Sequence, residues 1–480
     1  MTKSIFFTAP DPTLKLVHND VWLPGLYSRR ILCFSLASGS SHETAIDVIQ
    51  RGLQALVQGT PELGGTSIVI QNAAPHDAAY PWREIVPGQG IELVTKDLTT
   101  SFASYDDLER TGFPLSSFKD DELMPIEGPI MPEPAAIARF QLNLIEGGVL
   151  LSCCIYHHLT DGNGMNAIIR ALAEECKRAG KAPGGLPPRV LDSNRAALSA
   201  ANGSMTDLKH HPAYSILKDA FVPVAHHDEA PPEVNGEEPP PPPQFQPHYY
   251  YLSNDNAQAL KDYGSRDTPV STHDAISAAI WRNLIISRLK TGELKDTDQV
   301  TSYSIPHNAR KYLGLPNTWV GNCTYFILAQ ATVSEVVAED SLPILASRIR
   351  AAMKEVDTEH VKGILAVRKQ DPYSLNWWPI MQVNGPHLVG MTSFYHSELM
   401  GTDWGKHLGE PKHFTCTDLG GFATQFQRAH FVGPRLPGGR ACYVHVGLVK
   451  PEVEHYRADP AWNKYFQLKE ITEHLSSGRK

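Results

Sequence analysis

A histidine and an aspartate stand four positions apart in the short stretch 156–164, YHHLTDGNG. They are His157 and Asp161. Imidazole titrates near neutral pH, so a positioned histidine can take a proton from a hydroxyl or an amine as it attacks a carbonyl. His157 is therefore a candidate general base. Taken alone, this spacing also occurs by chance in many proteins, so the rest of the chain has to support a catalytic reading.

Asp161 and Gly162 are expected to shape the turn that follows the histidine. The aspartate can hold the turn through an ion pair or backbone hydrogen bonds, and the glycine can adopt a backbone conformation that other residues resist. Neither residue is expected to react.

Two regular elements must position this stretch. The apolar run 147–155 precedes it and predicts a buried strand, which would deliver His157 to a cleft. Residues 165–176 follow with apolar residues at helical spacing, so a helix is expected to begin beside Asp161. The positive end of a helix dipole favours such a charge.

Both halves of the chain mix helices and strands. The first half predicts a helix at 45–57 entered through Ser40 and Ser41, a turn at 59–65, strands at 66–70 and 91–94, and a half-buried strand at 138–145. The second half predicts a helix after Ser271, strands at 300–305, 324–328 and 442–448, and helices around 345–356 and 452–456. The fold class is therefore α/β throughout.

One segment differs sharply in composition. Residues 226–247, HHDEAPPEVNGEEPPPPPQFQP, contain five consecutive prolines and few residues that could build a core. Such a segment is an extended connector, or alternatively a ligand for a proline-binding module. As a connector it divides the chain into a first lobe at 1–225, a crossover linker at 226–247 and a second lobe at 248–480.

Size and composition agree with two globular domains. A chain of 480 residues exceeds one ordinary core and suggests two domains of roughly 200 residues. The net charge of −9 disfavours a nucleic-acid partner, and no apolar run approaches the roughly 20 residues of a membrane span. A cytoplasmic location and no membrane partner are expected.

The seven cysteines are odd in number and include no Cys-x-x-Cys pair, so neither a disulfide framework nor a zinc site is indicated, and no metal is expected. Cys153 and Cys154 adjoin His157 but fall within the predicted strand, where buried packing is the expected role.

Several short motifs of this chain resemble those of one known family. The stretch from Gly147 through the histidine motif resembles the BAHD acyltransferases, including their fungal members of the trichothecene acetyltransferase type. Further matches run in the family's order along nearly the whole chain. They are the proline turn at 58–65, the segment at 191–195, the helix at 271–282, Asn308-Ala309-Arg310, Trp319-Val320-Gly321-Asn322 and the segment at 403–411.

The last segment, DWGKHLGEP, is similar to the family's Asp-Phe-Gly-x-Gly signature, with Trp404 in place of phenylalanine and His407 in place of the second glycine. Upstream, Thr392-Ser393-Phe394 stands where many plant members carry Thr-Ser-Trp. Phe394 lacks the indole donor, so an acceptor contact through that ring is not carried over.

Peptide-synthetase condensation domains share this fold and carry His-His-x-x-x-Asp-Gly. Here only Leu159 and Thr160 separate His158 from Asp161, so the three-residue gap begins at His157. The BAHD register fits, and His157 is the catalytic choice. His158 is expected to point to the opposite face if the local chain is extended.

The resemblance implies two similar chloramphenicol acetyltransferase-like domains, each a mixed sheet flanked by helices, with an active-site channel between them. It also implies an acyl-CoA-dependent O-acyltransferase that transfers a short acyl group, expected to be acetyl, to a hydroxyl of a secondary metabolite. His157 would act as general base without a covalent acyl-enzyme, and Thr392 would stabilise the oxyanion. Asp161 would pair with Arg310, and Asp403 and Gly405 would be structural.

On this reading acyl-CoA is a co-substrate, no cofactor is bound permanently, and the protein is a monomer with a small-molecule acceptor. Two other readings stay open. One is an enzyme of the same fold that uses a carrier-protein-bound acyl donor, or that cyclises or condenses a polyketide- or peptide-derived substrate. The other is a non-catalytic relative that only binds a ligand or partner. The aromatic residues Trp377, Trp378, Phe394, Tyr395 and Trp404 suggest either an apolar cleft wall or core packing.

Overall fold

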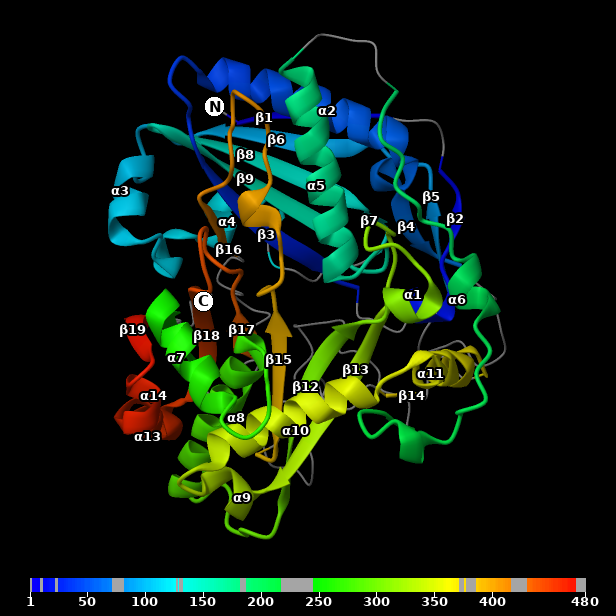
Figure 1. Cartoon of the computed structure of the whole chain (residues 1–480). Coiled ribbons are helices and arrows are strands. Elements are labelled where there is room, and N and C mark those ends of the chain that lie inside the picture. The colour runs from blue at the N-terminus through cyan, green and yellow to red at the C-terminus, as the bar shows by residue number, and fades with distance from the viewer. Residues whose placement is uncertain are drawn as a thin grey trace, which may run out of the picture.

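The structure is a computed structural model that describes residues 2–8, 12–21, 25–70, 82–126, 128, 133–181, 187–216, 245–370, 375–376, 386–415 and 430–471. It has two lobes, and each lobe is built on a twisted sheet with helices packed against it (Figure 1). The α/β fold expected of both halves is confirmed.

The first lobe contains a six-stranded mixed sheet that carries the histidine motif. Its strands, in spatial order, are β1 (Thr2–Phe7), β6 (Ile91–Asp97), β8 (Ala138–Ile145), β9 (Gly148–Tyr156), β3 (Tyr27–Ser35) and β16 (His413–Thr415). Helices α2 (His42–Gly59) and α5 (Gly162–Ala179) lie against this sheet (Figure 1). They confirm the helices predicted at 45–57 and 165–176.

The sequence explains where these elements begin. The Ser41 side chain accepts a hydrogen bond from the backbone N of Thr44, so α2 has the polar N-cap that its first turn requires. Every residue of β9 is buried, as its continuous apolar sequence predicts. His157 follows the last residue of this strand.

The strand predicted at 138–145 is confirmed as β8, but the prediction that it is half-buried was wrong. Seven of the eight residues of β8 are buried. The strand lies between β6 and β9 in a sheet against which α2 and α5 pack (Figure 1), and the chain at Glu122 and Leu123 meets its polar side chains. Its polar side chains find partners inside: Gln141 Nε2 donates to Glu122 O at 2.9 Å and Asn143 Nδ2 donates to Leu123 O at 3.1 Å. The alternation of polar and apolar residues therefore did not indicate a solvent-exposed face, because the polar side chains are hydrogen-bonded in the interior.

A smaller sheet of four short strands extends the first lobe on the side of α1 (His18–Val21). Its strands are β2 (Leu14–Lys15), β5 (Arg83–Val86), β4 (Thr66–Val69) and β7 (Ala135–Ala136). The turn expected at 59–65 is the short 3₁₀ helix η1 (Pro61–Gly64), which leads from α2 into β4.

The second lobe is built on a seven-stranded mixed sheet. Its strands, in spatial order, are β13 (Thr324–Thr332), β12 (Val300–Asn308), β15 (Leu388–Ser393), β17 (His430–Val432), β18 (Cys442–Val449), β11 (Phe245–Leu252) and β19 (Phe466–Ile471). The helices packed with it include α7 (Asn254–Gly264), α8 (Thr272–Lys290), α10 (Ser341–Glu355) and α13 (Lys450–Ala458). Ser271 caps α8, as its sequence predicts.

Short elements complete the described chain. They are α3 (Tyr105–Thr111), η2 (Leu115–Ser117), α4 (Asp120–Leu123), α6 (Ala196–Ala200), η3 (Leu208–His210), β10 (Ser215–Ile216), η4 (Arg310–Leu313), α9 (Val333–Val337), α11 (Thr358–Gln370), β14 (Leu375–Asn376), η5 (Leu399–Gly401) and α14 (Pro460–Asn463). Strands β10 and β14 pair with each other.

The two lobes exchange one segment. Strand β16 comes from the second half of the sequence but pairs with β3 at the edge of the first lobe's sheet, with Phe414 beside Leu32. Three side chains that precede it, Met400, Trp404 and Leu408, are buried in the first lobe's core. The region around 399–415 therefore belongs spatially to the first lobe.

Most of the predicted linker, residues 226–244, lies outside the described residues. Its last three residues, 245–247, already form the start of β11 and pair with β18. The boundaries at 225 and 248 stay a prediction.

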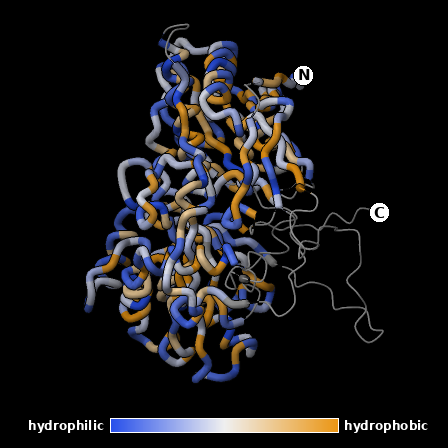
Figure 2. Tube along the Cα trace, turned by 90° about the vertical axis from the view of Figure 1, so that its right-hand side faces the viewer, coloured by the Kyte–Doolittle hydropathy of each residue, from blue (hydrophilic) through white to orange (hydrophobic). Residues whose placement is uncertain are grey.

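Hydrophobic residues recur along the chain in both lobes (Figure 2). Among the helices that the structure describes, none combines the length and the apolar composition needed to cross a membrane.

Candidate active site

The histidine motif forms a turn immediately after β9. His157 N donates to Leu26 O at 2.7 Å, and Asn322 Nδ2 donates to the carbonyl oxygens of His157 at 2.9 Å and His158 at 3.2 Å. Asn322 comes from the second half of the chain. The backbone that presents His157 is thus held from both lobes.

His157 is partly exposed, and its environment keeps the imidazole neutral. Burial in the protein lowers the pKa of His157 below its ordinary value, and the neighbouring carboxylate of Asp161 only partly opposes this shift. A neutral imidazole has a free lone pair and can accept a proton. The electrostatics therefore suit a general base at neutral pH.

Asp161 is the N-cap of α5 and binds Arg310 in a buried pair. Its Oδ1 accepts from the backbone N of Asn163 at 3.1 Å and of Gly164 at 3.0 Å. Arg310 donates through Nη2 to Oδ1 at 2.8 Å and through Nη1 to Oδ2 at 2.9 Å. Oδ2 also accepts from the backbone N of Cys323 at 2.8 Å. The structure thus brings the two predicted supporting residues together.

All five N–H groups of Arg310 have acceptors. Besides Asp161, they donate to Trp319 O at 3.1 Å, Gly321 O at 2.8 Å and the Asn308 side chain at 3.2 Å. A buried guanidinium is stable only when its charge and its donors are matched in this way. The pair therefore fixes residues 319–323 of the second lobe against the turn.

The same pair sets the ionisation of Asp161. Burial alone would raise the pKa of Asp161, but the charge and hydrogen bonds of Arg310, together with the backbone donors, hold it below its usual value. Asp161 is therefore a carboxylate that is fully used in hydrogen bonding.

A second buried ion pair lies beside the first, and one of its members, Asp20, has no recognisable signal in the sequence. Arg195 Nε donates to Asp20 Oδ2 at 2.9 Å, and Arg195 Nη2 donates to Leu159 O at 2.7 Å. Asn322 Nδ2 donates to Asp20 Oδ1 at 3.1 Å. Arg195 and Asn322 fall within segments that resemble family landmarks, whereas Asp20 lies in the four-residue helix α1.

Trp319 separates the two arginines. The centroid of its ring lies 5.3 Å from the guanidinium carbon of Arg310 and 5.2 Å from that of Arg195, and its Nε1 donates to Asn194 O at 2.9 Å. Cation–π contacts of this kind strengthen when they are shielded from water, and Trp319 is fully buried.

Gly162 does not adopt the special backbone conformation predicted for it, and the steric constraint falls on Gly164 instead. Gly162 is the first residue of α5 and does not have a positive φ; a Cβ there would meet only Arg30 Nη2, at an ordinary 3.6 Å. A Cβ at Gly164 would lie 1.8 Å from Thr160 Oγ1 and 3.2 Å from Arg310 Nη2. Only a residue without a side chain fits there.

His158 lies in a turn rather than in extended chain, so the premise for its predicted direction does not hold. It is fully buried, with Nδ1 3.6 Å from Glu133 Oε1 and its ring edge-on to Tyr156 at 4.9 Å. Glu133 also accepts from Ser67 Oγ at 2.8 Å and Arg83 Nε at 2.9 Å. His158 thus belongs to a polar cluster inside the first lobe.

Thr392 lies near the end of β15, in the second lobe. β15 runs parallel to β12, with Ser304 beside Gly390, so the carboxyl ends of both strands lie at one edge of the sheet. From that edge β12 continues into Arg310, which binds the turn of His157. Thr392 and His157 share no hydrogen bond within the described ranges.

Asp403 and Gly405 lie at the opposite end of α5. Asp403 Oδ2 lies 2.7 Å from Lys177 Nζ, and Oδ1 accepts from the backbone N of Gly405 at 2.7 Å. Gly405 has φ +92°, and a Cβ would lie 2.9 Å from Lys177 Cα, so a glycine is required on both counts. Lys177 is fifteen residues after Gly162, roughly 22 Å along the helix axis.

The other expectations concern cysteines, metals and aromatic residues. The six cysteines that the structure describes are free and buried, and Cys416 lies outside these residues. Within the part of the chain that the structure describes, no group of three or more histidine, cysteine, aspartate or glutamate residues is placed so that it could hold a metal ion. Trp404 packs edge-on against Phe34 in the core. Trp377 and Trp378 lie outside the described residues.

Comparison with known proteins places this geometry in a family. The profile of the trichothecene 3-O-acetyltransferase-like N-terminal domain matches residues 26–176, and that of the transferase family matches residues 141–426. The chain is 28% identical over 452 residues to the enoyl-CoA isomerase/hydratase claC of Penicillium crustosum, covering 92% of this chain and 49% of that protein. It therefore spans about half the length of that relative.

Other relatives match end to end. The chain is 24% identical over 473 residues to the trichothecene 3-O-acetyltransferase TRI101 of Fusarium sporotrichioides, covering 95% of this chain and 96% of that one. The structure of F. graminearum TRI101 complexed with coenzyme A and T-2 mycotoxin superposes with a TM-score of 0.76 at 20% identity, over 96% of this chain and 100% of that chain. Vinorine synthase superposes with a TM-score of 0.62 at 15% identity, over 95% and 96%.

These likenesses confirm the fold expected from the motifs. Since the transferase profile alone matches more than half of the sequence, the chain belongs to the transferase family, the BAHD acyltransferases, and carries an N-terminal domain of the trichothecene 3-O-acetyltransferase type.

Proposed function

We propose that the chain is an acyl-CoA-dependent O-acyltransferase that moves a short acyl group, acetyl, from coenzyme A to a hydroxyl of a small secondary metabolite. The observation that carries the proposal is the neutral, partly exposed imidazole of His157, held by Asn322 and by the buried pair of Asp161 and Arg310. The coenzyme A bound in the structure of F. graminearum TRI101 supports the choice of donor.

In this mechanism His157 takes the proton of the acceptor hydroxyl as its oxygen attacks the thioester carbonyl carbon. The carbon–oxygen bond forms, and the carbonyl oxygen becomes an oxyanion, to which the Thr392 hydroxyl donates. The tetrahedral intermediate then collapses, the carbon–sulfur bond breaks, and the leaving thiolate receives the proton from the imidazolium of His157. Ester and free thiol are the products, and no acyl-enzyme forms.

The test is His157→Ala with acetyl-CoA as the only donor, measured by release of the coenzyme A thiol. Loss of a general base is expected to lower kcat/KM by about 10²–10⁴-fold without lowering the unfolding midpoint. His455→Ala on α13, a histidine outside the motif, serves as the matched control. Undiminished turnover by the His157→Ala variant would refute the role. Turnover that requires a carrier protein would refute the donor.

The role of Thr392 is tested separately. Thr392→Val keeps the branched shape and removes the hydroxyl, so kcat is expected to fall by about 10²–10³-fold. Thr392→Ser restores a hydroxyl and is expected to recover most of the loss. Equal activity of the Val and Ser variants would leave the threonine only a packing role.

A further inference from the structure

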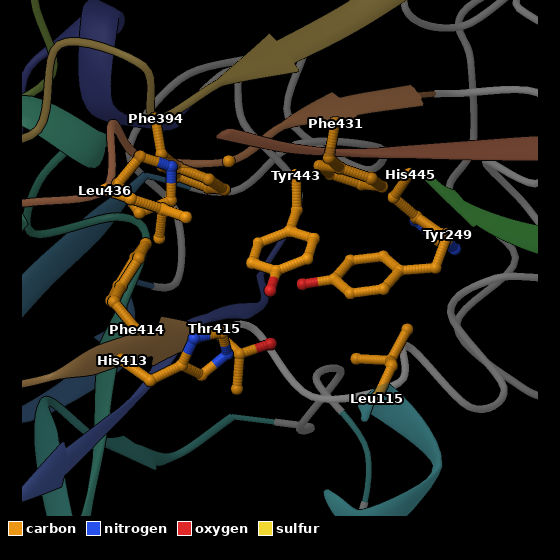
Figure 3. A pocket seen from close by; sticks show the side chains of 12 residues that line it. Leu115, Tyr249, Phe394, His413, Phe414, Thr415, Phe431, Leu436, Tyr443 and His445 are labelled. Atoms are coloured by element: carbon orange, nitrogen blue, oxygen red, sulfur yellow. The ribbon is translucent and has the colours of Figure 1, made fainter. Parts of the chain in front are cut away.

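Four side chains form one row across the second lobe's sheet. Thr392 on β15 lies beside Phe431 on β17, Phe431 lies opposite His445 on β18, and His445 lies opposite Tyr249 on β11. Residues paired across neighbouring strands point to the same face of a sheet. Thr392 therefore begins a row whose other three members line a pocket (Figure 3).

The pocket lies between the two lobes. The row from the second lobe's sheet forms one wall. Phe414 and Thr415 of β16, which belongs to the first lobe's sheet, and Leu115 of η2 line it from the other side. Neighbouring strands are about 4.8 Å apart, so the row from Thr392 to Tyr249 spans roughly 14 Å. A small organic molecule can lie along this row and reach Thr392.

Arg30 lies between the pocket lining and the start of α5, since its Nη2 would be 3.6 Å from a Cβ at Gly162. Phe394, two residues after Thr392, lines the pocket, and the guanidinium of Arg30 lies 4.3 Å from its ring centroid. After burial and the neighbouring histidine, the charge of Arg30 is a further cause of the lowered pKa of His157. A ligand against Phe394 is therefore close to Thr392, and Arg30 separates it from the start of α5.

The walls present flat rings. Tyr249 and Tyr443 are stacked with their centroids 4.9 Å apart and an interplanar angle of 4°. Phe431 and His445 are stacked at 5.7 Å and 21°. Figure 3 shows the hydroxyls of Tyr249 and Tyr443 close together in the middle of the view. Each pair uses one ring face for its own stacking, and the remaining faces and edges form an aromatic lining that favours an apolar ligand carrying an aromatic ring.

The lining also lacks charge. Among the residues that the structure describes, the twelve that line the pocket include no lysine, arginine, aspartate or glutamate. Burial lowers the pKa of His413, one of the lining residues, to about 3, so this imidazole is neutral. The phosphates of coenzyme A require cationic or hydrogen-bond-rich surroundings, whereas a neutral ligand does not. The pocket therefore suits the acceptor better than the phosphorylated part of the donor.

We propose that this pocket holds the acyl acceptor, with its reacting hydroxyl toward Thr392, and that the acceptor is a planar, uncharged aromatic alcohol of the phenol or naphthol class. The inference rests on the proposed function and names its substrate class.

The first experiment compares 2-naphthol with decahydro-2-naphthol, which has the same carbon skeleton and hydroxyl but puckered, saturated rings. Binding to the full chain and to its His157→Ala variant is measured by calorimetry, so the result does not depend on turnover. Because aromatic residues make up much of the pocket lining, 2-naphthol is expected to bind about tenfold more tightly or better. Equal affinities would overturn the inference.

The second experiment changes the wall. Phe431→Leu keeps an apolar side chain but removes the flat ring, and is expected to weaken 2-naphthol binding by about 2–10-fold while leaving decahydro-2-naphthol unchanged. Phe6→Leu makes the same change at an exposed position and is expected to change neither affinity. If the two variants bind 2-naphthol equally well, the pocket is not the site.

Acetylation of both alcohols from acetyl-CoA separates the two proposals. A higher kcat/KM for 2-naphthol supports both. Equal rates for the two alcohols would overturn the pocket inference and leave the acyltransferase intact. Selective binding of 2-naphthol without any acetylation would support the pocket and refute the proposed function.

Discussion

The two ends of helix α5 each meet an aspartate that belongs to one of the two sequence signatures, and the two contacts differ in kind. At the N-terminus Asp161 pairs with Arg310, and their side chains are 4% and 0% exposed. At the C-terminus Lys177 pairs with Asp403, and their side chains are 35% and 49% exposed. Both pairs join a helix of the first lobe to residues from the second half of the chain.

The difference shows which end of the helix has to be rigid. A buried ion pair cannot lose one partner without leaving an uncompensated charge, whereas an exposed pair is solvated and screened by salt. The buried pair supports the turn that presents His157, and the exposed pair lies roughly 22 Å away along the helix. The first signature therefore constrains geometry that the second does not.

The largest effect is expected from Asp161→Asn. The variant leaves the buried guanidinium of Arg310 without a counter-charge, which is expected to lower the free energy of unfolding by about 3–5 kcal/mol and to reduce activity. Denaturant unfolding followed by circular dichroism measures the loss. If Asp161→Asn proves no more costly than Asp403→Asn, the contrast between the two ends of α5 is wrong.

The pH dependence of the free energy of unfolding tests the same contrast. Because the pKa of Asp161 is lower in the folded protein than the ordinary value near 3.9, its contribution to stability is present above about pH 4 and is lost as pH falls through the folded pKa. Unfolding free energy measured from pH 6 to pH 2 is expected to fall more steeply in the wild type than in Asp161→Asn. Parallel curves would contradict this assignment.

Alanine substitutions at Gly162 and Gly164, in the first turn of α5, test the steric difference between these two positions. Gly164→Ala forces a methyl group against Thr160 and is expected to cost about 1–3 kcal/mol of stability. Gly162→Ala meets only an ordinary contact and is expected to change stability by less than that. The thermal midpoints of both variants provide the measurement, and a reversed order would show that the turn is shaped differently.

The smallest effect is expected for the exposed pair of Lys177 and Asp403. Asp403→Asn keeps an acceptor for the backbone N of Gly405 and removes only the charge, so no measurable change in the unfolding midpoint is expected at physiological ionic strength. Lys177→Met is the matched change on the other partner. A large loss of stability in either variant, insensitive to added salt, would place this pair among the essential contacts.

Local patterns in the sequence predicted much of the fold. The apolar run before His157 became β9, and the helical spacing after it became α5, because a buried strand and an amphipathic helix are recognisable from residue periodicity. The family followed from short motifs in a fixed order. The position of His157 at the end of a buried strand could be predicted in the same way.

Other features depend on residues that are far apart in the sequence. Asp20, Arg195 and Asn322 meet in one buried network, and β16 pairs with β3 across nearly 400 positions. No local pattern marks such contacts, because each partner has ordinary polar or apolar neighbours. The wrong prediction for the backbone of Gly162 has the same origin, since only the approach of Thr160 and Arg310 shows that the steric constraint falls on Gly164.

The sequence by itself determined the α/β class, the family and the candidate base, because these depend on residue type, periodicity and spacing within short segments. Only the tertiary structure decided which charges are buried, which glycine is required and which aromatic rings line the pocket that leads to Thr392. Those properties arise from surfaces that the packing of the two lobes brings together. The free energies of burial and ion pairing therefore depend on contacts between residues that are far apart in the sequence.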